Sequence, residues 1–372
     1  MSTDEVVARD HARLDRIAHD HLGRALARAE PMAAGLGTRR FHRLHFADDG
    51  GPATLVARIE DDGALPPPAT NWPTPPPWLA EPALEPLLGF LAEAGLPVPA
   101  SALHLEAEGI DLLEDVGDTN LLCVPEDARR ARTLEACALL PRLQALEAEA
   151  RAIPAFGRAY DATLIATKAW KFLNWTVPML LGRPASAAEQ SEIGALFDAI
   201  TSLATAAPKR LAHRDCKAEN LHLVRHAEAS ARLVMIDVQG AFLAPPEYDL
   251  ACLLYDLQVT NDEAFVEEAL AATRETLPDR PDEETFRTRF DALALARLCK
   301  DVAHVVHAGV ARGDRRRWHE IPRGLALISM IAGRRAHTLP GLTKLASVTA
   351  ALTAALESSD SGRRGATGAP GA

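Results

Sequence analysis

The sequence predicts an α+β protein of two lobes, a small β-rich N-terminal lobe and a larger helical C-terminal lobe. Three observations predict this fold class. The chain has 372 residues, of which 48% are apolar, enough for about two domains with their own cores. Up to about residue 116, short apolar runs with strand-like alternation are separated by turn residues. Beyond it, apolar residues recur mainly at helical intervals.

Residues 1–30 are predicted to form an N-terminal amphipathic helix. Leucine and isoleucine residues recur there at near-helical intervals among charges, as on a helix with one buried stripe (Leu14, Ile17, Leu22 and Leu26). We expect this helix to serve packing. The same charges exclude the apolar core of a secretory signal.

The N-terminal lobe is predicted to span residues 31–116 and to begin with a β-hairpin. Two strand-like runs, 41–46 and 54–60, flank a turn rich in aspartate and glycine. Because side chains alternate along a strand, one face of the second run is core and the other face, with Val56 and Arg58, is available. The predicted core residues of this run are Leu55, Ala57 and Ile59.

The rest of this lobe follows a proline-rich connection. Nine of the 26 prolines lie between residues 66 and 86, where they favour an irregular surface segment. A helix over 84–94 and two short strands, 103–105 and 110–114, are predicted next. The residues 115–118 then break the pattern, and we place the lobe boundary there.

The C-terminal lobe, residues 117–357, is predicted to carry catalysis and substrate binding on a helical frame. Helical spacing is clearest over 128–151, 186–204 and 286–312. The final residues, 358–372, contain serine, glycine, proline and alanine without periodicity, which predicts a disordered tail.

One segment of the C-terminal lobe combines polar residues with two short strands, 221–224 and 233–236. If the strands pair as a hairpin, Asn220 just before the first and Asp237 just after the second lie at the same edge. Oxygen ligands in this arrangement suit Mg²⁺, which is usually held by one or two protein groups together with nucleotide phosphates. We therefore predict Asn220 and Asp237 as metal ligands.

Asp215 lies five residues before Asn220, where it would face the metal-bound phosphate. Phosphoryl transfer needs a carboxylate that orients the acceptor hydroxyl and takes its proton, and Asp215 is predicted in that role. Lys217 is predicted beside the transferred phosphate. His213 and Asp249 are predicted as structural support for this loop, although Asp249 could also be an ordinary helix cap.

These residues together resemble the protein-kinase-like superfamily, through His213-x-Asp215-x-x-x-x-Asn220 and the later Asp237. Only eleven residues separate Asp237 from Asp249, too few for a regulated activation loop, so a protein substrate is disfavoured. The sequences of 236–241 and 246–251 are similar to the aminoglycoside phosphotransferase and choline kinase group. Within that group, the sequence of 112–122 resembles the bacterial anomeric N-acetylmuramate/N-acetylglucosamine kinases.

The resemblance implies ATP and Mg²⁺ as cofactors and a set of nucleotide contacts. Arg58 aligns with the strand lysine that grips the phosphates in many kinases, and either Glu81 or Glu85 would be its acidic partner. The residues implied at the nucleotide are Gly35, Gly37 and Thr38 in a glycine loop, Val56 and Arg58 on the strand, and Glu114 and Val116 beside adenine.

The resemblance also implies a hydroxyl of a small molecule as acceptor, with an amino sugar of the N-acetylmuramate or N-acetylglucosamine type first. An aminoglycoside- or choline-type kinase and a catalytically silent nucleotide-binding scaffold are the alternatives. Polar and aromatic residues on the helical side are candidate acceptor contacts, although residues of these types are more often ordinary helix surface and core (Tyr160, Asp161, Lys171, Asn174 and Trp175).

The composition of the chain indicates which binding partners and which cellular compartment to expect. A formal charge of −11 argues against nucleic acid as a partner, and it favours a solvated face or a sugar-acid anchor for the arginines of 312–317. Five cysteines without paired spacing predict reduced thiols in the cytoplasm. The longest late apolar run, 325–333, is too short to span a membrane.

Overall fold

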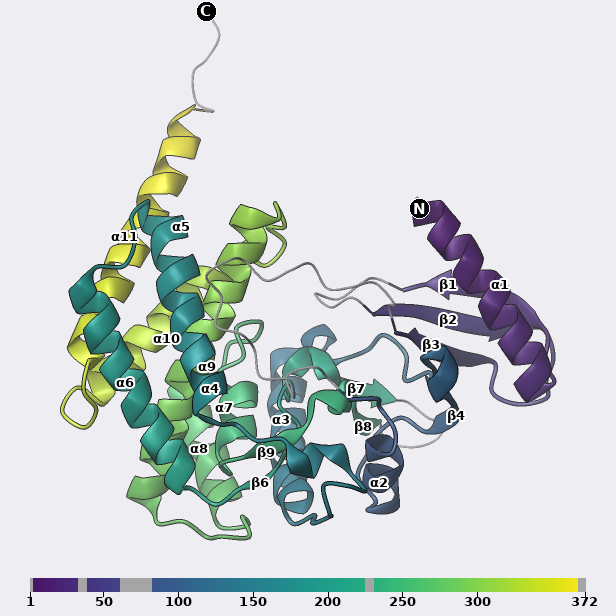
Figure 1. The fold of residues 1–372 in the computed structure, drawn as a ribbon. Helices are drawn as coiled ribbons and strands as arrows, with labels where there is room; N and C mark the ends of the chain where they lie inside the picture. The colour runs from purple at the N-terminus through teal and green to yellow at the C-terminus, as the bar shows by residue number, and fades with distance from the viewer. Residues whose placement is uncertain (1–2, 33–38, 61–81, 225–230, 367–372) are drawn as a thin grey trace, which may run out of the picture. The chain divides into compact units, whose positions relative to one another are not determined.

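The computed structural model describes residues 3–32, 39–60, 82–224 and 231–366 (Figure 1). Within them the chain forms two compact units. The first holds the described residues up to Asn120 and also the segment Leu221–Gln239, and the second holds Leu121–Asn220 and the described residues from Gly240 on. The chain thus changes unit after Asn120 rather than after Val116, and it returns to the first unit for one hairpin.

The first unit contains a five-stranded antiparallel sheet in the order β1-β2-β3-β5-β4. Helix α1 (Thr3–Leu22) packs Leu14 and Ile17 into one cluster with Leu44, Ala57 and Leu112 of the sheet. The bounds are Leu26–Pro31 for β1, Arg40–Phe46 for β2, Thr54–Ile59 for β3, Ser101–Leu105 for β4 and Ile110–Glu114 for β5. The short helices α2 (Leu87–Glu93) and η2 (Glu106–Glu108) complete this part.

The predicted N-terminal helix over 1–30 is too long, because α1 ends at Leu22. Gly23 has φ +64°, a left-handed conformation that suits glycine and ends the helix, and β1 follows from Leu26. Leu22 and Leu26 pack on the same cluster from two different elements. Their spacing of four residues therefore imitates a helix that is not continuous.

The predicted hairpin 41–46/54–60 is confirmed as β2 and β3, but the second face of β3 is closed at Arg58, while Val56 is half-buried. Leu55, Ala57 and Ile59 are buried on the core face as predicted. On the opposite face Arg58 is also buried, with 3% of its surface exposed, because it lies against carboxylates of its own sheet. A charged strand residue is thus enclosed by partners and not left to solvent.

A second hairpin completes the first unit and confirms the predicted strand pair. Strands β7 (Leu221–Val224) and β8 (Arg232–Met235) are antiparallel, with Leu221 opposite Met235. His222 bridges to Asn120 and its Nδ1 lies 2.9 Å from the carbonyl oxygen of Gly117. From the bounds of these strands, Asn220 directly precedes β7, and Asp237 follows β8 after a single residue.

The second unit is mostly helical, as predicted, around the 29-residue helix α9 (Glu283–Ala311), which packs against α4, α6, α7 and α10. Strands β6 (Arg210–Ala212) and β9 (Phe242–Ala244) pair as a two-stranded sheet, and the predicted site residues 213–237 lie between them in the sequence. The other helices are α3 (Glu126–Gln144), α4 (Ala162–Lys171), α5 (Val177–Leu181), α6 (Ala187–Ala206), α7 (Tyr248–Leu254), α8 (Glu263–Arg274), α10 (Ile321–Arg334) and α11 (Leu342–Ala366). The short helices are η3 (Leu121–Cys123), η4 (Pro154–Gly157), η6 (Ala218–Asn220), η7 (Val238–Gly240) and η8 (Trp318–Glu320), and a π-helix, η5 (Phe172–Thr176), joins α4 to α5.

Helix starts follow capping residues that the sequence displays. Ser186 and Glu189 form a reciprocal capping box at α6, and the side chains of Asp161, Asp262 and Asp282 accept backbone N–H groups at α4, α8 and α9. None of the helices in the described ranges is long and apolar enough to cross a membrane.

The predicted disordered tail from 358 is wrong for 358–366, where the backbone of α11 continues to Ala366. The helix is anchored earlier by a buried stripe that includes Leu345, Val348 and Leu352. Once a helix is nucleated, each further residue adds a hydrogen bond at little cost, so a polar sequence can extend it. Residues 367–372 lie outside the described residues.

Candidate active site

The segment that carries the predicted base is fixed at both ends by buried carboxylates of the second unit. Asp249, within α7, accepts hydrogen bonds from the backbone N–H groups of His213 (2.7 Å) and Arg214 (3.0 Å). Asp256 accepts one from the N–H of Ala218 (2.9 Å). Burial raises the pKa of both carboxyl groups. Asp249 is not the cap of α7, a position that Glu247 occupies, and its contacts are those of a residue that braces the loop.

The loop backbone is held in an unusual conformation at Arg214. Its φ is +80°, a value that residues other than glycine adopt rarely and that recurs at functional sites. The carbonyl oxygen of Arg214 accepts hydrogen bonds from the thiol of Cys252 (3.4 Å) and from Nη1 of Arg297 (3.0 Å). These bonds hold the strained peptide in place just before Asp215.

Asp215 is surrounded by cations. Nη2 of Arg297 lies 3.2 Å from its Oδ1, and a quarter of the side chain remains exposed (26%). Burial acts to raise the pKa of Asp215, but Arg297, Lys300, Arg214 and Lys217 outweigh it and hold the pKa well below its ordinary value. The carboxylate is therefore ionised at neutral pH and can accept a hydrogen bond from a hydroxyl group.

Lys217 and Glu219 form an ion pair on the same loop. Burial acts to lower the pKa of Lys217, but Glu219 and Asp215 outweigh it and raise the pKa. Glu219 also accepts a hydrogen bond from Nε2 of Gln258 (3.0 Å). Lys217 is thus a protonated cation in a fixed position near the predicted base.

The two predicted metal ligands differ in setting. Asn220 is buried, and its Nδ2 donates to the carbonyl oxygen of Asp215 (2.9 Å), so its side-chain oxygen points away from that bond. Asp237 is exposed, has φ +62°, and accepts a hydrogen bond from Nε2 of Gln239 (2.5 Å). An amide oxygen and a carboxylate are donors of the kind that Mg²⁺ takes. No group of three or more His, Cys, Asp or Glu side chains suited to a metal occurs among the described residues.

In the first unit, Arg58 is paired within the sheet. Its Nη1 donates to Asp111 (2.6 Å), which stands opposite it on β5, and its Nη2 donates to Glu60. Asp111 also lies 2.6 Å from Nδ1 of His104. The predicted partner Glu85 instead accepts from the N–H of Gly89 (3.0 Å), which corrects that assignment. The other candidate, Glu81, lies outside the described residues.

Of the remaining predicted nucleotide contacts, the structure describes Glu114, Val56 and Val116 but not the glycine loop. The N–H of Glu114 donates to the carbonyl oxygen of Ala100 (2.8 Å), and its side chain accepts from Arg232, so this N–H is already used within the unit. Val56 lies on β3 and Val116 is buried after β5. The glycine-loop residues Gly35, Gly37 and Thr38 lie outside the described residues.

Helix α9 supplies polar residues that the sequence analysis missed. Arg297, Lys300, Asp301 and His304 occupy one face of this largely buried helix. Asp301 binds Nε of Arg297 (3.2 Å) and Nζ of Lys300 (2.7 Å). The spacing i, i+3, i+4, i+7 was the available signal, because a polar stripe on a buried helix needs partners.

The candidate acceptor residues separate into core and surface. Of the two roles open to Tyr160, the structure shows the core one, since it is 1% exposed and packs on Phe242 and Tyr248. Asp161 caps α4. By contrast, Nζ of Lys171 lies 2.9 Å from Nε2 of His304, and Trp175 of η5 stacks on His307, with ring centroids 4.2 Å apart. Asn174 is exposed, and its Nδ2 donates to the carbonyl oxygen of Trp170 (2.9 Å).

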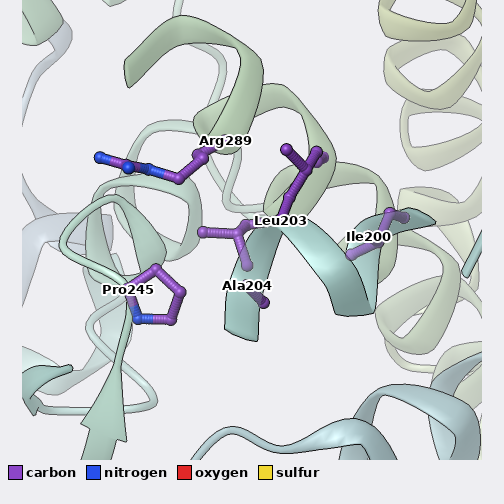
Figure 2. A pocket seen from close by; sticks show the side chains of 7 residues that line it. Ile200, Leu203, Ala204, Pro245 and Arg289 are labelled. Atoms are coloured by element: carbon purple, nitrogen blue, oxygen red, sulfur yellow. The ribbon is translucent and has the colours of Figure 1, made fainter. Parts of the chain in front are cut away.

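A small pocket between α6 and α9 does not belong to this site (Figure 2). It has no room for a water molecule, and its one charged lining residue, Arg289, is bound to Glu247 (2.6 Å). The lining residues are Ile200, Leu203, Ala204, Pro245, Arg289, Ala292 and Leu293. We interpret it as a packing gap.

Comparison with solved structures identifies the class of fold. The chain superposes on the choline kinase LicA from Streptococcus pneumoniae with a TM-score of 0.55 at 13% identity, covering 89% of this chain and 100% of that one. The GDP complex of aminoglycoside 2'-phosphotransferase-IIIa gives a TM-score of 0.54 at 15% identity, covering 87% and 98%. The protein therefore has the two-lobed kinase-like fold that the sequence predicts.

The chain belongs to the phosphotransferase enzyme family, whose model matches residues 29–285. It is 28% identical over 271 residues to the N-acetylmuramate/N-acetylglucosamine kinase of Pseudomonas putida, covering 71% of this chain and 76% of that protein. The same-named kinase of Neisseria meningitidis is 29% identical over 252 residues, covering 64% and 72%. The prediction of an ATP-dependent small-molecule kinase is confirmed by this family and these relatives.

Proposed function

We propose that the protein transfers the γ-phosphoryl group of ATP to a hydroxyl group of an amino sugar of the N-acetylmuramate or N-acetylglucosamine type. The observation that carries the proposal is the ionised Asp215 on a braced loop that also carries Lys217 and Asn220. The names of the sequence relatives support the acceptor class. An aminoglycoside or choline acceptor has support only from fold neighbours of low identity.

In the proposed reaction, Asp215 accepts the hydrogen bond of the acceptor hydroxyl and takes its proton as the oxygen bonds to the γ-phosphorus and ADP leaves. Lys217, protonated beside Asp215, stabilises the negative charge of the transferred group. Arg297 and Asp249 are positioning residues, because they act on Asp215 and on the loop backbone.

Asn220 and Asp237 are proposed to hold Mg²⁺, and the pairing of β7 with β8 supports this because the two residues adjoin the same end of that hairpin along the chain. When bound, Mg²⁺ neutralises charge on the nucleotide phosphates. Two protein ligands are enough when phosphate oxygens complete the shell. Arg58, Val56 and Val116 remain proposed nucleotide contacts.

The test is ADP release from ATP and Mg²⁺ with a panel of amino sugars, an aminoglycoside and choline. We expect stimulation by the amino sugars and a fall in kcat of roughly 100- to 10,000-fold in Asp215→Asn. Asp198→Asn, an exposed aspartate on α6, is the matched control and keeps full activity. Turnover with choline alone would refute the acceptor class, and unchanged turnover in Asp215→Asn would refute the assigned base.

A further inference from the structure

A surplus of positive charge lies beside Asp215 in the second unit. Among the described residues, four cations interact electrostatically there with Asp215 and Asp301, and one of them, Arg297, also interacts with the buried Asp249. The cations are Lys171, Arg214, Arg297 and Lys300, whereas burial and like charges hold the pKa of the adjacent Lys168 well below its ordinary value. The neighbouring Lys217 is matched by its own partner, Glu219, and leaves this balance unchanged. In a chain with a net charge of −11, such a concentration of like charge favours an anionic ligand.

A chain of contacts connects this surplus to the proposed base. Arg297 contacts both Asp215 (3.2 Å) and Asp301 (3.2 Å), and Asp301 contacts Lys300 (2.7 Å). Lys300 and Asp301 are 18% and 22% exposed, so both reach the surface. The cationic face of α9 thus extends from the base toward solvent.

Lys171 approaches the same face from the end of α4. Its Nζ lies 2.9 Å from Nε2 of His304. Burial first, and then Lys171 and Lys300, hold the pKa of His304 well below its ordinary value, so the ring is neutral and accepts from the ammonium group. Burial, with Lys300 and Arg214, lowers the pKa of Lys171 to about 8. Desolvation and like charges thus destabilise the protonated form of Lys171, and a bound anion would stabilise that form.

An aromatic surface adjoins the cations. Nζ of Lys171 lies 5.5 Å from the ring centroid of Trp175, which is half-buried and stacks on His307. Trp175 belongs to the π-helix η5, a rare conformation that often marks functional sites. A flat aromatic face beside charged donors suits a sugar ring that carries an acidic group.

We propose that Lys171, Lys300 and Trp175 form an acceptor subsite that selects sugars bearing a carboxylate substituent. Lys171 and Lys300 bind the carboxylate while Trp175 packs on the sugar. The inference rests on the proposed function and names the preferred acceptor within it. The same charges would disfavour a polycationic aminoglycoside.

The test compares N-acetylmuramate with N-acetylglucosamine, which has the same ring without the lactyl carboxylate. In Lys171→Met, the ratio of kcat/KM for the acid to that for the neutral sugar should fall roughly tenfold or more, mainly through KM, because a charge-assisted contact is lost. Lys171→Arg should restore part of the ratio. Lys344→Met on α11 is the matched control and leaves the ratio unchanged.

Two outcomes would overturn the subsite. An unchanged ratio would remove Lys171 from acceptor selection. An equal loss for both sugars would mean that the cations serve the transferred phosphate or the fold. Calorimetric titration of both sugars, without nucleotide, separates this inference from the proposed reaction. If neither sugar is phosphorylated, the proposed reaction is refuted. The subsite is still supported if Lys171→Met lowers the ratio of the affinity for N-acetylmuramate to that for N-acetylglucosamine. An unchanged affinity ratio, or no binding of either sugar to the wild-type protein, refutes the subsite.

Discussion

Two buried arginines, one predicted from the sequence and one found only in the structure, have different electrostatic surroundings. Arg58 in the first unit has two carboxylate partners, Asp111 and Glu60. Arg297 in the second unit shares Asp215 and Asp301 with several further cations. Around Arg58 the two carboxylates are matched, because Glu60 also pairs with Arg39 (3.5 Å) and Asp111 also contacts His104 (2.6 Å). Around Arg297 the cations outnumber the carboxylates.

The difference shows that a buried charge alone does not mark a binding site. The Arg58 cluster is electrostatically complete, and the pocket beside it, about 210 Å³ in volume, is lined by Glu60, Glu106 and Asp111 as well as His104. In the cluster on α9 the cations outnumber the carboxylates, and we propose that an anionic group of the acceptor balances them. We therefore expect mutations around Arg58 to act on stability and mutations on α9 to act on the ligand.

The largest expected effect on stability comes from breaking the Arg58 pair. Arg58→Met leaves Asp111 buried without its cation and should lower the free energy of unfolding by about 3–5 kcal/mol, measured by urea denaturation. Replacing both residues, as in Arg58→Met with Asp111→Leu, should cost less than the single change. The control is Arg28→Met, since Arg28 is 62% exposed and its pair with Glu30 contributes at most about 1 kcal/mol.

Unchanged stability in Arg58→Met would contradict this half of the comparison, because the ion pair would then contribute nothing to the fold. Nucleotide binding measured on the same variant tests the proposed nucleotide contact of Arg58 separately.

A smaller effect is expected from the hydrogen bonds of Asp249 that brace the loop before Asp215. Asp249→Ala removes the acceptor of two backbone N–H groups, and each unsatisfied buried group costs about 1–3 kcal/mol. We expect the urea midpoint and kcat to fall together, because Asp215 follows the released backbone. Asp198→Ala is the exposed control, and a stable Asp249→Ala enzyme with normal kcat would show that the loop does not need the brace.

The smallest effect is a pH dependence that sharpens the comparison. The pKa of Lys171 is lowered to about 8, first by burial and then by Lys300 and Arg214. Lys168 on the same helix and Asp301 and His304 on α9 also face this region. Protonated Lys171 is positive below that pH, so kcat/KM for N-acetylmuramate should fall as the pH rises through about 8.

The pH profile of kcat/KM for N-acetylglucosamine is the reference, and above about pH 8 this kcat/KM should fall less steeply than that for N-acetylmuramate. In Lys171→Arg the alkaline fall for the acid should disappear, because arginine stays charged. Identical profiles for the two sugars in the wild-type protein would contradict the assignment of Lys171 to the carboxylate.

Local patterns made much of this arrangement predictable. Asp215, Lys217 and Asn220 lie within six residues, and β7 and β8 are close neighbours in the chain, so spacing alone placed them on one loop and one hairpin. Strand alternation likewise identified the core face of β3.

Long-range packing was not predictable in the same way. The pairing of Arg58 with Asp111 depends on β3 lying beside β5, 53 residues away in sequence. Arg297 reaches Asp215 across 82 residues. Tyr160 had the residue type of a sugar contact, but only its packing on Tyr248 shows that it is core.

The most direct test of the central claim is product analysis after incubation of the purified protein with ATP, Mg²⁺ and N-acetylglucosamine or N-acetylmuramate. Mass spectrometry should detect a sugar carrying one added phosphoryl group in amounts equal to ADP, and Asp215→Asn should produce almost none. Release of inorganic phosphate without a sugar phosphate, or equal product from Asp215→Asn, would contradict the account.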